Sequence, residues 1–132
     1  WSVPNEIELI LVKQVASYLA TPIFLVDWAG TLLYYNEPAE ALLGMRYEET
    51  GEMPLKEWGT IFAPTDRDGA VLLPEELALA TAVLQRRPAH ERISITGLDG
   101  ARRDLSVTAF PLVGLNDRYL GAVAIFWESS AA

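Results

Sequence analysis

Hydrophobic residues recur at helical spacing over residues 5–20, between Pro4 and the Thr21-Pro22 pair that ends the pattern. Two adjacent apolar rows run along this predicted helix: Ile7, Leu11, Val15 and Tyr18 in one, and Leu9, Val12, Ala16 and Leu19 in the other. One row is enough to pack a helix on a single core. Two rows predict that the helix covers its own domain and also contacts a partner. The candidate residues for these two contacts are Ile7, Leu11, Val15, Tyr18, Leu9 and Val12.

A β-hairpin is predicted after this helix. Residues 22–28 form a strand-like apolar run, Ala29-Gly30 fits a tight turn, and residues 31–35 fit the partner strand. Asn36 follows as the N-cap of a short helix, because its side-chain oxygen can accept a free backbone N–H at a helix start. Gly44 is placed to end that helix. We expect both residues to have structural roles.

The middle of the chain contains a long irregular segment and a second amphipathic helix. Residues 45–73 lack a regular pattern, apart from short helical turns near 55–58. A long helix is predicted over residues 74–87, because its acidic start and its basic end at Arg86-Arg87 both suit the helix dipole. Its inward row comprises Leu77, Ala80, Thr81 and Leu84, with Leu79 and Val83 beside it.

The last third of the chain is predicted to be β-structure. Residues 91–96 and 102–108 alternate between apolar and polar positions, as half-exposed strands do, and the turn between them includes Gly100. The second of these strands continues to Phe110. A connector over 111–118 leads to a final strand over 119–127.

Two of the predicted strands are apolar at nearly every position. Residues 22–28 and 119–127 have this pattern, which is typical of strands covered on both faces. The first and last strands should therefore lie at the centre of one sheet. The helices from residue 36 onward would cover one face, and the helix over 5–20 would cover the other. The predicted fold class is α+β.

Composition excludes several kinds of function. The chain has 132 residues, which suits one domain, and its net charge of −8 disfavours binding to nucleic acid or to an anionic membrane. It has no Cys and one His, so disulfides, thiolate sites and any metal site that needs two imidazoles are excluded. No apolar run is long enough to span a bilayer, and no leader is visible. We expect a cytoplasmic domain.

Candidate chemistry is sparse. No nucleophile–base pair or metal-ligand spacing is found, so we predict neither an enzyme nor a metal site. Arg102-Arg103 could bind an anion, but cross-strand pairing with acids such as Glu91 is the favoured interpretation. Aromatic residues in or beside the irregular segment could line a pocket, although core packing explains them as well. The candidate pocket residues are Tyr35, Trp58, Phe62, Val83, Ile95 and Val107.

The order of elements resembles the PAS sensory fold over about residues 18–128. The local motifs that carry the resemblance are Pro22-Ile-Phe-Leu-Val-Asp27 followed by Gly30, Tyr35-Asn36-x-x-Ala39-Glu40-x-Leu42-Leu43-Gly44, Asp99-Gly100, and Gly121-Ala-Val-Ala-Ile-Phe126. The resemblance implies a five-stranded antiparallel sheet with the chain-end strands at its centre. It also implies a sensory or interaction module that holds a small ligand or dimerises, and that acts on an attached effector such as a kinase or cyclase.

The resemblance also bears on cofactors. Flavin-adduct and coumaric-acid photosensors of this family need a Cys, which this chain lacks. Haem-binding members usually place a His on the long helix, whereas residues 74–87 contain none and His90 lies beyond Pro88. No cofactor is therefore predicted.

These observations lead to one functional prediction and two alternatives. Residues 1–20 would be a helix that covers the sheet or contacts a partner, 21–128 a PAS domain, and 129–132 a tail leading to a possible effector. The domain would be a non-enzymatic module of a larger, bacterial signalling protein, and it would relay ligand or partner binding through the packing of a homodimer. The alternatives are a sensor that binds a small organic molecule near Trp58 and Phe62, and a pure protein-interaction scaffold.

Overall fold

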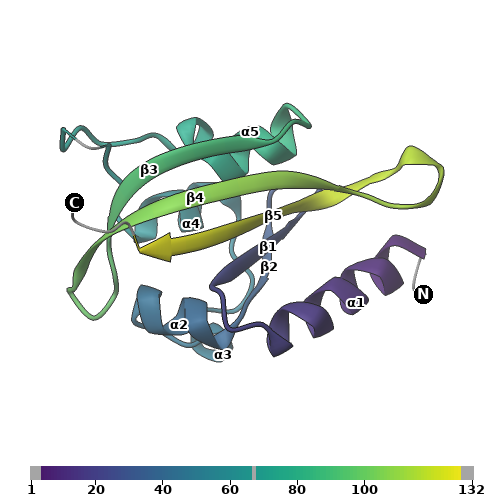
Figure 1. The fold of residues 1–132 in the computed structure, drawn as a ribbon, viewed down its shortest axis with the longest axis horizontal. Coiled ribbons are helices and arrows are strands. Elements are labelled where there is room, and N and C mark those ends of the chain that lie inside the picture. Colours follow the sequence, from purple (N-terminus) through teal and green to yellow (C-terminus); the bar gives the residue numbers. More distant parts are fainter. Residues whose placement is uncertain (1–3, 67, 129–132) are drawn as a thin grey trace.

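The computed structural model describes residues 4–66 and 68–128, so the predicted tail over 129–132 and the first three residues lie outside the description. Within these residues, five strands form one antiparallel sheet in the order β2-β1-β5-β4-β3 (Figure 1). The strands are β1 (Ile23–Asp27), β2 (Leu32–Tyr35), β3 (Ala89–Thr96), β4 (Arg102–Val113) and β5 (Tyr119–Glu128). The predicted α+β class is confirmed, as is the prediction that the first and last strands pair inside the sheet.

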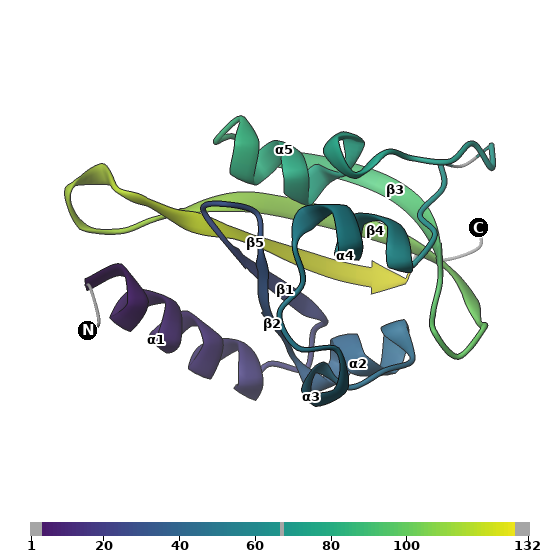
Figure 2. The same ribbon diagram turned by 180° about the vertical axis from the view of Figure 1, so that it is seen from behind.

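Helices cover both faces of this sheet. They are α1 (Pro4–Tyr18), α2 (Glu37–Leu43), α3 (Tyr47–Thr50), α4 (Leu55–Ile61) and α5 (Ala78–Leu84), with short 3-10 turns η1 (Pro74–Glu76) and η2 (Leu115–Asp117). The helices from α2 to α5 lie on one side of the sheet and α1 lies on the other (Figures 1 and 2). The predicted cover over the second face is therefore confirmed.

The two covered faces explain why β1 and β5 are apolar throughout. Side chains alternate across a strand, so Phe24 and Ala124 belong to the larger core under α2, α4 and α5. Leu25 and Val123 belong to the smaller core under α1. A strand with helices on both sides has no polar face to present to water.

The caps of α2 are formed as the sequence predicts. Asn36 has an extended backbone and accepts a hydrogen bond from the Ala39 N–H, and Gly44 ends the helix in the left-handed region at φ 77°. Gly100 also has a left-handed backbone, at φ 83°, in the β3–β4 turn. At these three positions the local backbone favours the residue that is present: a side-chain acceptor at Asn36, and a residue that tolerates a positive φ at Gly44 and Gly100.

The helix predicted over 74–87 is shorter than expected and is interrupted. The 3-10 turn η1 stops at Glu76, Leu77 is extended at φ −73° and ψ 147°, and α5 begins only at Ala78. The interruption buries Leu77 in the core. It also leaves Leu84, predicted to point inward, 54 % exposed at the end of α5.

Two predictions outside this helix also need adjustment. The irregular segment over 45–73 contains α3, and the helical turn predicted near 55–58 is confirmed but continues to Ile61 as α4. The expected connector over 111–118 is shorter, because β4 continues to Val113. Among the described residues, no helix has the length and apolar character needed to cross a membrane.

Candidate functional site

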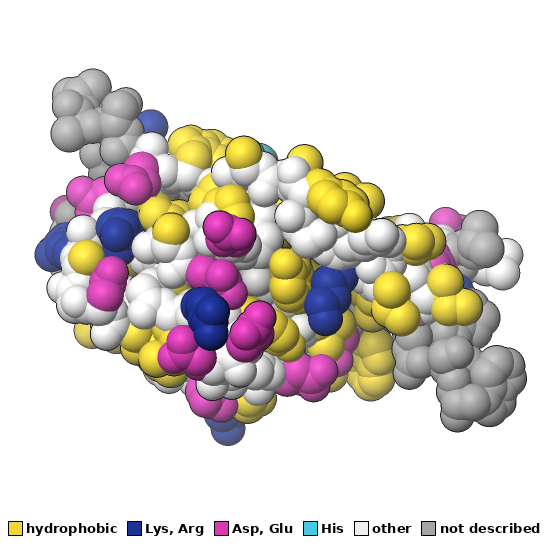
Figure 3. Space-filling model, turned by 90° about the horizontal axis from the view of Figure 1, so that it is seen from below, with side chains coloured by type: hydrophobic (Ala, Val, Ile, Leu, Met, Phe, Trp, Pro, Cys, Tyr) yellow, Lys and Arg dark blue, Asp and Glu magenta, His cyan; other side chains and the backbone are white. Residues whose placement is uncertain are grey.

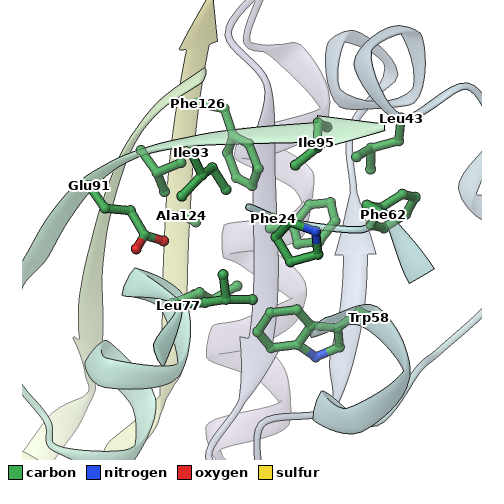
Figure 4. A pocket seen from close by; sticks show the side chains of 13 residues that line it. Phe24, Leu43, Trp58, Phe62, Leu77, Glu91, Ile93, Ile95, Ala124 and Phe126 are labelled. Atoms are coloured by element: carbon green, nitrogen blue, oxygen red, sulfur yellow. The ribbon is translucent and has the colours of Figure 1, made fainter. Parts of the chain in front are cut away.

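A small cavity lies between the sheet and the helices that cover its larger core. Its volume is about 50 Å³, and β1, β3, β4, β5, α4 and α5 all contribute to its lining (Figure 4). The lining residues are Phe24, Leu43, Trp58, Phe62, Pro64, Leu77, Leu79, Glu91, Ile93, Ile95, Val107, Ala124 and Phe126. The lining is almost entirely apolar, with Glu91 as its one ionisable side chain.

Four aromatic rings form much of the cavity wall. Phe24 lies at their centre, with ring-centroid distances of 5.2 Å to Phe126, 6.3 Å to Trp58 and 6.4 Å to Phe62. The Trp58 and Phe62 rings meet the Phe24 ring edge-on, a favoured geometry for aromatic pairs. The Trp58 indole is fixed in place because its Nε1–H donates to the Gly30 carbonyl at 2.8 Å.

Four of the six predicted pocket residues line this cavity: Trp58, Phe62, Ile95 and Val107. Tyr35 and Val83 do not, although both are buried. The Tyr35 hydroxyl instead donates to the Met45 carbonyl at 2.9 Å and lies 3.1 Å from the Thr50 hydroxyl. Burial raises the pKa of this phenol above its ordinary value.

Glu91 lines the cavity, whereas its sequence context predicts a cross-strand ion pair. It was expected to pair with Arg102 or Arg103, but β3 and β4 place it opposite Val107. Arg103 instead donates to the Leu42 carbonyl at 2.9 Å, and Arg102 donates to the Ser94 hydroxyl at 3.3 Å. The predicted pairing with Glu91 was therefore wrong, although Arg103 does form an ion pair with another acid, Asp99 in the β3–β4 turn, at 3.9 Å. The signal that could have found Glu91 is its inward position in the alternating pattern of β3.

The Glu91 carboxylate has one hydrogen-bond donor among the described residues. Its Oε1 accepts the Ala78 N–H at 2.7 Å, at the first residue of α5. Burial raises the pKa of this carboxyl, and the Ala78 hydrogen bond opposes that rise. Glu91 is only half-buried, whereas the twelve other lining residues are buried. Glu91 is thus the lining residue with the greatest exposure to solvent.

The second feature of interest is the outward face of α1. Leu9, Val12 and Ala16 pack against the sheet. The opposite face is strongly exposed and apolar, with Ile7 at 54 %, Ile10 at 60 %, Leu11 at 56 %, Val15 at 59 % and Tyr18 at 79 %. Figure 3 views the side of the molecule on which α1, α2 and α3 lie, and it shows exposed hydrophobic side chains beside charged ones.

Both ends of α1 are attached to the rest of the fold. Near the N-terminal end, Arg118 in the β4–β5 connection forms an ion pair with Glu8 at 2.8 Å. At the C-terminal end, the buried Asn36 side chain donates to the Ala16 carbonyl at 2.9 Å and to the Thr21 carbonyl at 2.8 Å. These contacts connect α1 to the β4–β5 connection and to the N-cap of α2.

Polar chemistry elsewhere in the described residues is limited. No group of three or more His, Asp or Glu side chains in residues 4–66 and 68–128 has an arrangement that could hold a metal ion. His90 is exposed and its Nδ1 lies 3.0 Å from the Thr108 hydroxyl, on the opposite side of β3 from the cavity.

Comparisons with known proteins identify the fold. A scan against protein-family models found no match, and a search of curated proteins also found none. Solved structures do match. The PAS domain of nitrogen regulation protein NR(II) from Vibrio parahaemolyticus has a TM-score of 0.61 and 20% identity, over 90% of this chain and 98% of that one.

Two further matches agree with this one. The PAS domain of BvgS from Bordetella pertussis has a TM-score of 0.62 and 15% identity, over 93% of this chain and 86% of that one. The PAS domain of the fruit-fly ELK potassium channel has a TM-score of 0.71 and 8% identity, over 91% of this chain and 95% of that one. With its sheet order and its flanking helices, the chain therefore has the PAS fold.

Proposed function

We propose that this PAS-fold domain is a non-enzymatic sensory module of a larger cytoplasmic, bacterial signalling protein, and that it acts as a homodimer. The observation that carries the proposal is the outward apolar face of α1, formed by Ile7, Ile10, Leu11, Val15 and Tyr18. Exposed apolar side chains gathered on one side of a helix often mark an interaction surface. Binding of a ligand or partner would change the packing of the dimer and so regulate an effector.

A second copy of this chain is the occupant that best fits this surface. The five residues of the outward face contain no charge, so the same face on another molecule is complementary to it. A two-fold axis through the face would bury the helix of each copy against the other. The spacing of Ile7, Leu11, Val15 and Tyr18 places these residues in one row along α1, which suits helix-on-helix packing.

Asn36 is the residue that we propose couples a structural change in the core to the position of α1 in the dimer. Its Oδ1 accepts the Ile23 N–H of β1 and the Ala39 N–H of α2, and its Nδ2 holds the end of α1. A shift of β1 or α2 in response to a ligand would have to move these hydrogen bonds or break them. Either outcome changes the position of α1 relative to the sheet.

The proposed function also includes an effector domain that is covalently attached to this chain and regulated by it. Solved structures with this fold include domains of nitrogen regulation protein NR(II) and of a two-component sensor histidine kinase. Those roles belong to the neighbouring proteins. For this chain, they support a regulatory role in which the domain controls a covalently attached partner.

Light scattering tests the dimer directly. The mass of the domain in solution is measured with and without residues 1–20. The proposal predicts a dimer for the complete chain and loss of that dimer in the shortened one. A monomer in both forms would contradict it.

The cavity supports a second candidate function, which is sensing of a small organic molecule. Native mass spectrometry of freshly purified protein tests it, because a co-purifying mass indicates an occupied cavity. If the interior only stabilises an interaction scaffold, Phe62→Ala should lower the free energy of unfolding by about 3–5 kcal/mol and change no ligand affinity.

A further inference from the structure

We propose that the cavity binds a small primary alkylammonium ion, with the charged nitrogen at the Glu91 carboxylate and the hydrocarbon chain among the aromatic rings. This inference rests on the proposed sensory function and assigns a ligand class to its cavity. It is carried by the juxtaposition of one carboxylate with an otherwise apolar, aromatic wall.

The cavity has two chemically different ends. Glu91 extends from β3 on one side, and Phe24, Trp58 and Phe62 lie together on the other (Figure 4). A ligand that satisfies both ends needs one charged donor group and one apolar chain. An ammonium group supplies the charged donor for Glu91, and the hydrocarbon chain packs against the aromatic rings at the other end.

Glu91 has the capacity to bind a second donor. The Ala78 N–H occupies Oε1, and no described residue donates to Oε2. No described Lys or Arg forms an ion pair with this carboxylate either. A half-buried carboxylate without a cation is unfavourable, and an incoming ammonium ion would both neutralise the charge and satisfy the free oxygen.

The size of the cavity limits the length of the ligand. Its volume is about 50 Å³. A cavity of about 150 Å³ with a similar lining accommodates benzene, so this cavity suits a chain of only a few carbon atoms. Each methylene that fits should strengthen binding about fourfold, because its transfer from water is worth about 0.8 kcal/mol.

Propylamine and propan-1-ol are suitable probes, because they differ mainly in charge. Each is titrated into the complete chain at pH 7 while the amide signal of Ala78 and the indole signal of Trp58 are followed by NMR. We expect propylamine to bind at least tenfold more tightly than propan-1-ol and to shift both signals. Equal affinities, or no shift of either signal with propylamine, would overturn the assignment.

Two variants separate the role of Glu91 from general electrostatics. Glu91→Gln keeps an oxygen that can accept the Ala78 N–H but removes the charge, so the preference for propylamine should disappear. Glu75→Gln removes one charge from an exposed position on η1 and should keep the preference. Equal behaviour of the two variants would contradict direct contact with Glu91.

This test can fail without affecting the proposed function. If propylamine does not bind but light scattering shows a dimer that depends on residues 1–20, the ligand class is wrong and the dimeric module stands. If the chain is also a monomer, both proposals are wrong.

Discussion

Asn36 shows how much one buried side chain can connect. It is fully buried and makes four hydrogen bonds, accepting from Ile23 and Ala39 and donating to Ala16 and Thr21. An ordinary N-cap needs only an acceptor, a role that Asp fills as well as Asn. Here the amide nitrogen is also needed, and it is this nitrogen that holds α1.

The substitution Asn36→Asp tests this dual role. The carboxylate can still cap α2, but it would face the Ala16 and Thr21 carbonyls without a proton to donate. We expect the free energy of unfolding to fall by about 2–4 kcal/mol, because the buried Ala16 carbonyl and the partly buried Thr21 carbonyl both lose their donor. Urea denaturation measures the change. Asn116→Asp, at an exposed position in η2, serves as the control and should change little. An Asn36→Asp protein as stable as the original would contradict the account.

Glu91 should make stability depend on pH in a defined direction. Burial raises its pKa above the ordinary value of 4.5, so the folded chain holds the proton to a higher pH than the unfolded chain does. Stability is therefore lost as pH rises through the interval above 4.5. The loss amounts to about 1.4 kcal/mol for each unit by which the pKa is raised.

Glu91→Gln should remove this dependence. The variant should be more stable than the original chain at pH 7, and the difference should vanish below about pH 4, where both side chains are neutral. Urea denaturation at several pH values provides the measurement. The residues that face the Glu91 carboxyl from α5 and β4, Leu79 and Val107, carry no charge. The charged or titratable neighbours on β3, His90 and Arg92, project from the other face of that strand. The acids Glu75 and Glu76 lie on η1. An unchanged pH profile in the variant would refute the assignment.

At the scale of elements, the pairing of β1 with β5 depends on a close backbone approach at Gly121. A Cβ atom on this residue would overlap the Val26 carbonyl oxygen and lie 2.9 Å from the Asp27 Cα. Both neighbours belong to the backbone of β1, so neither can rotate away as a side chain would. Gly121 therefore permits the central strand pair.

Gly121→Ala should lower the free energy of unfolding by about 3 kcal/mol or more, because the two central strands would have to separate locally. Gly69→Ala provides the control: Gly69 also has a positive φ, of 89°, but its Cβ would meet no atom within 4 Å. That variant should cost only the backbone strain, about 1–2 kcal/mol. Thermal denaturation distinguishes the two, and equal losses would argue against the steric explanation.

Elements with local signals were predictable from the sequence, and elements that depend on distant contacts were not. Asn36 and Gly44 mark the ends of α2 through the chemistry of their own backbone, and the apolar runs of β1 and β5 indicate their central position. The interruption at Leu77 has no such signal. The new helix start at Ala78 is capped by Glu91, thirteen residues further along the chain, which accepts the Ala78 N–H.

The candidate site follows the same rule. Trp58 and Phe62 were predictable because large aromatics in an irregular segment usually pack toward the core, and both line the cavity. Tyr35 is directed away from it because its hydroxyl bonds to the Met45 carbonyl, a contact that only the fold creates. Glu91 was assigned to a cross-strand pair because sequence spacing does not reveal strand register.

At the scale of the whole molecule, α1 lies between a packed interior and an apolar surface that no other residue in 4–66 and 68–128 covers. One side of the helix covers Leu25 and Val123, and the other exposes an apolar row. Removing residues 1–20 eliminates both sides together, so it also uncovers the sheet. A point substitution on the outward face tests the dimer without this second effect.

Sedimentation equilibrium of Val15→Glu is therefore the most direct test of the central claim. Val15 is 59 % exposed on α1, and Val71, which is 77 % exposed outside α1, provides the matched control Val71→Glu. Neither substitution disturbs the core of a single chain. We expect the original chain and Val71→Glu to sediment as dimers and Val15→Glu to sediment as a monomer. A monomeric original chain, or a dimer that Val15→Glu leaves intact, would contradict it.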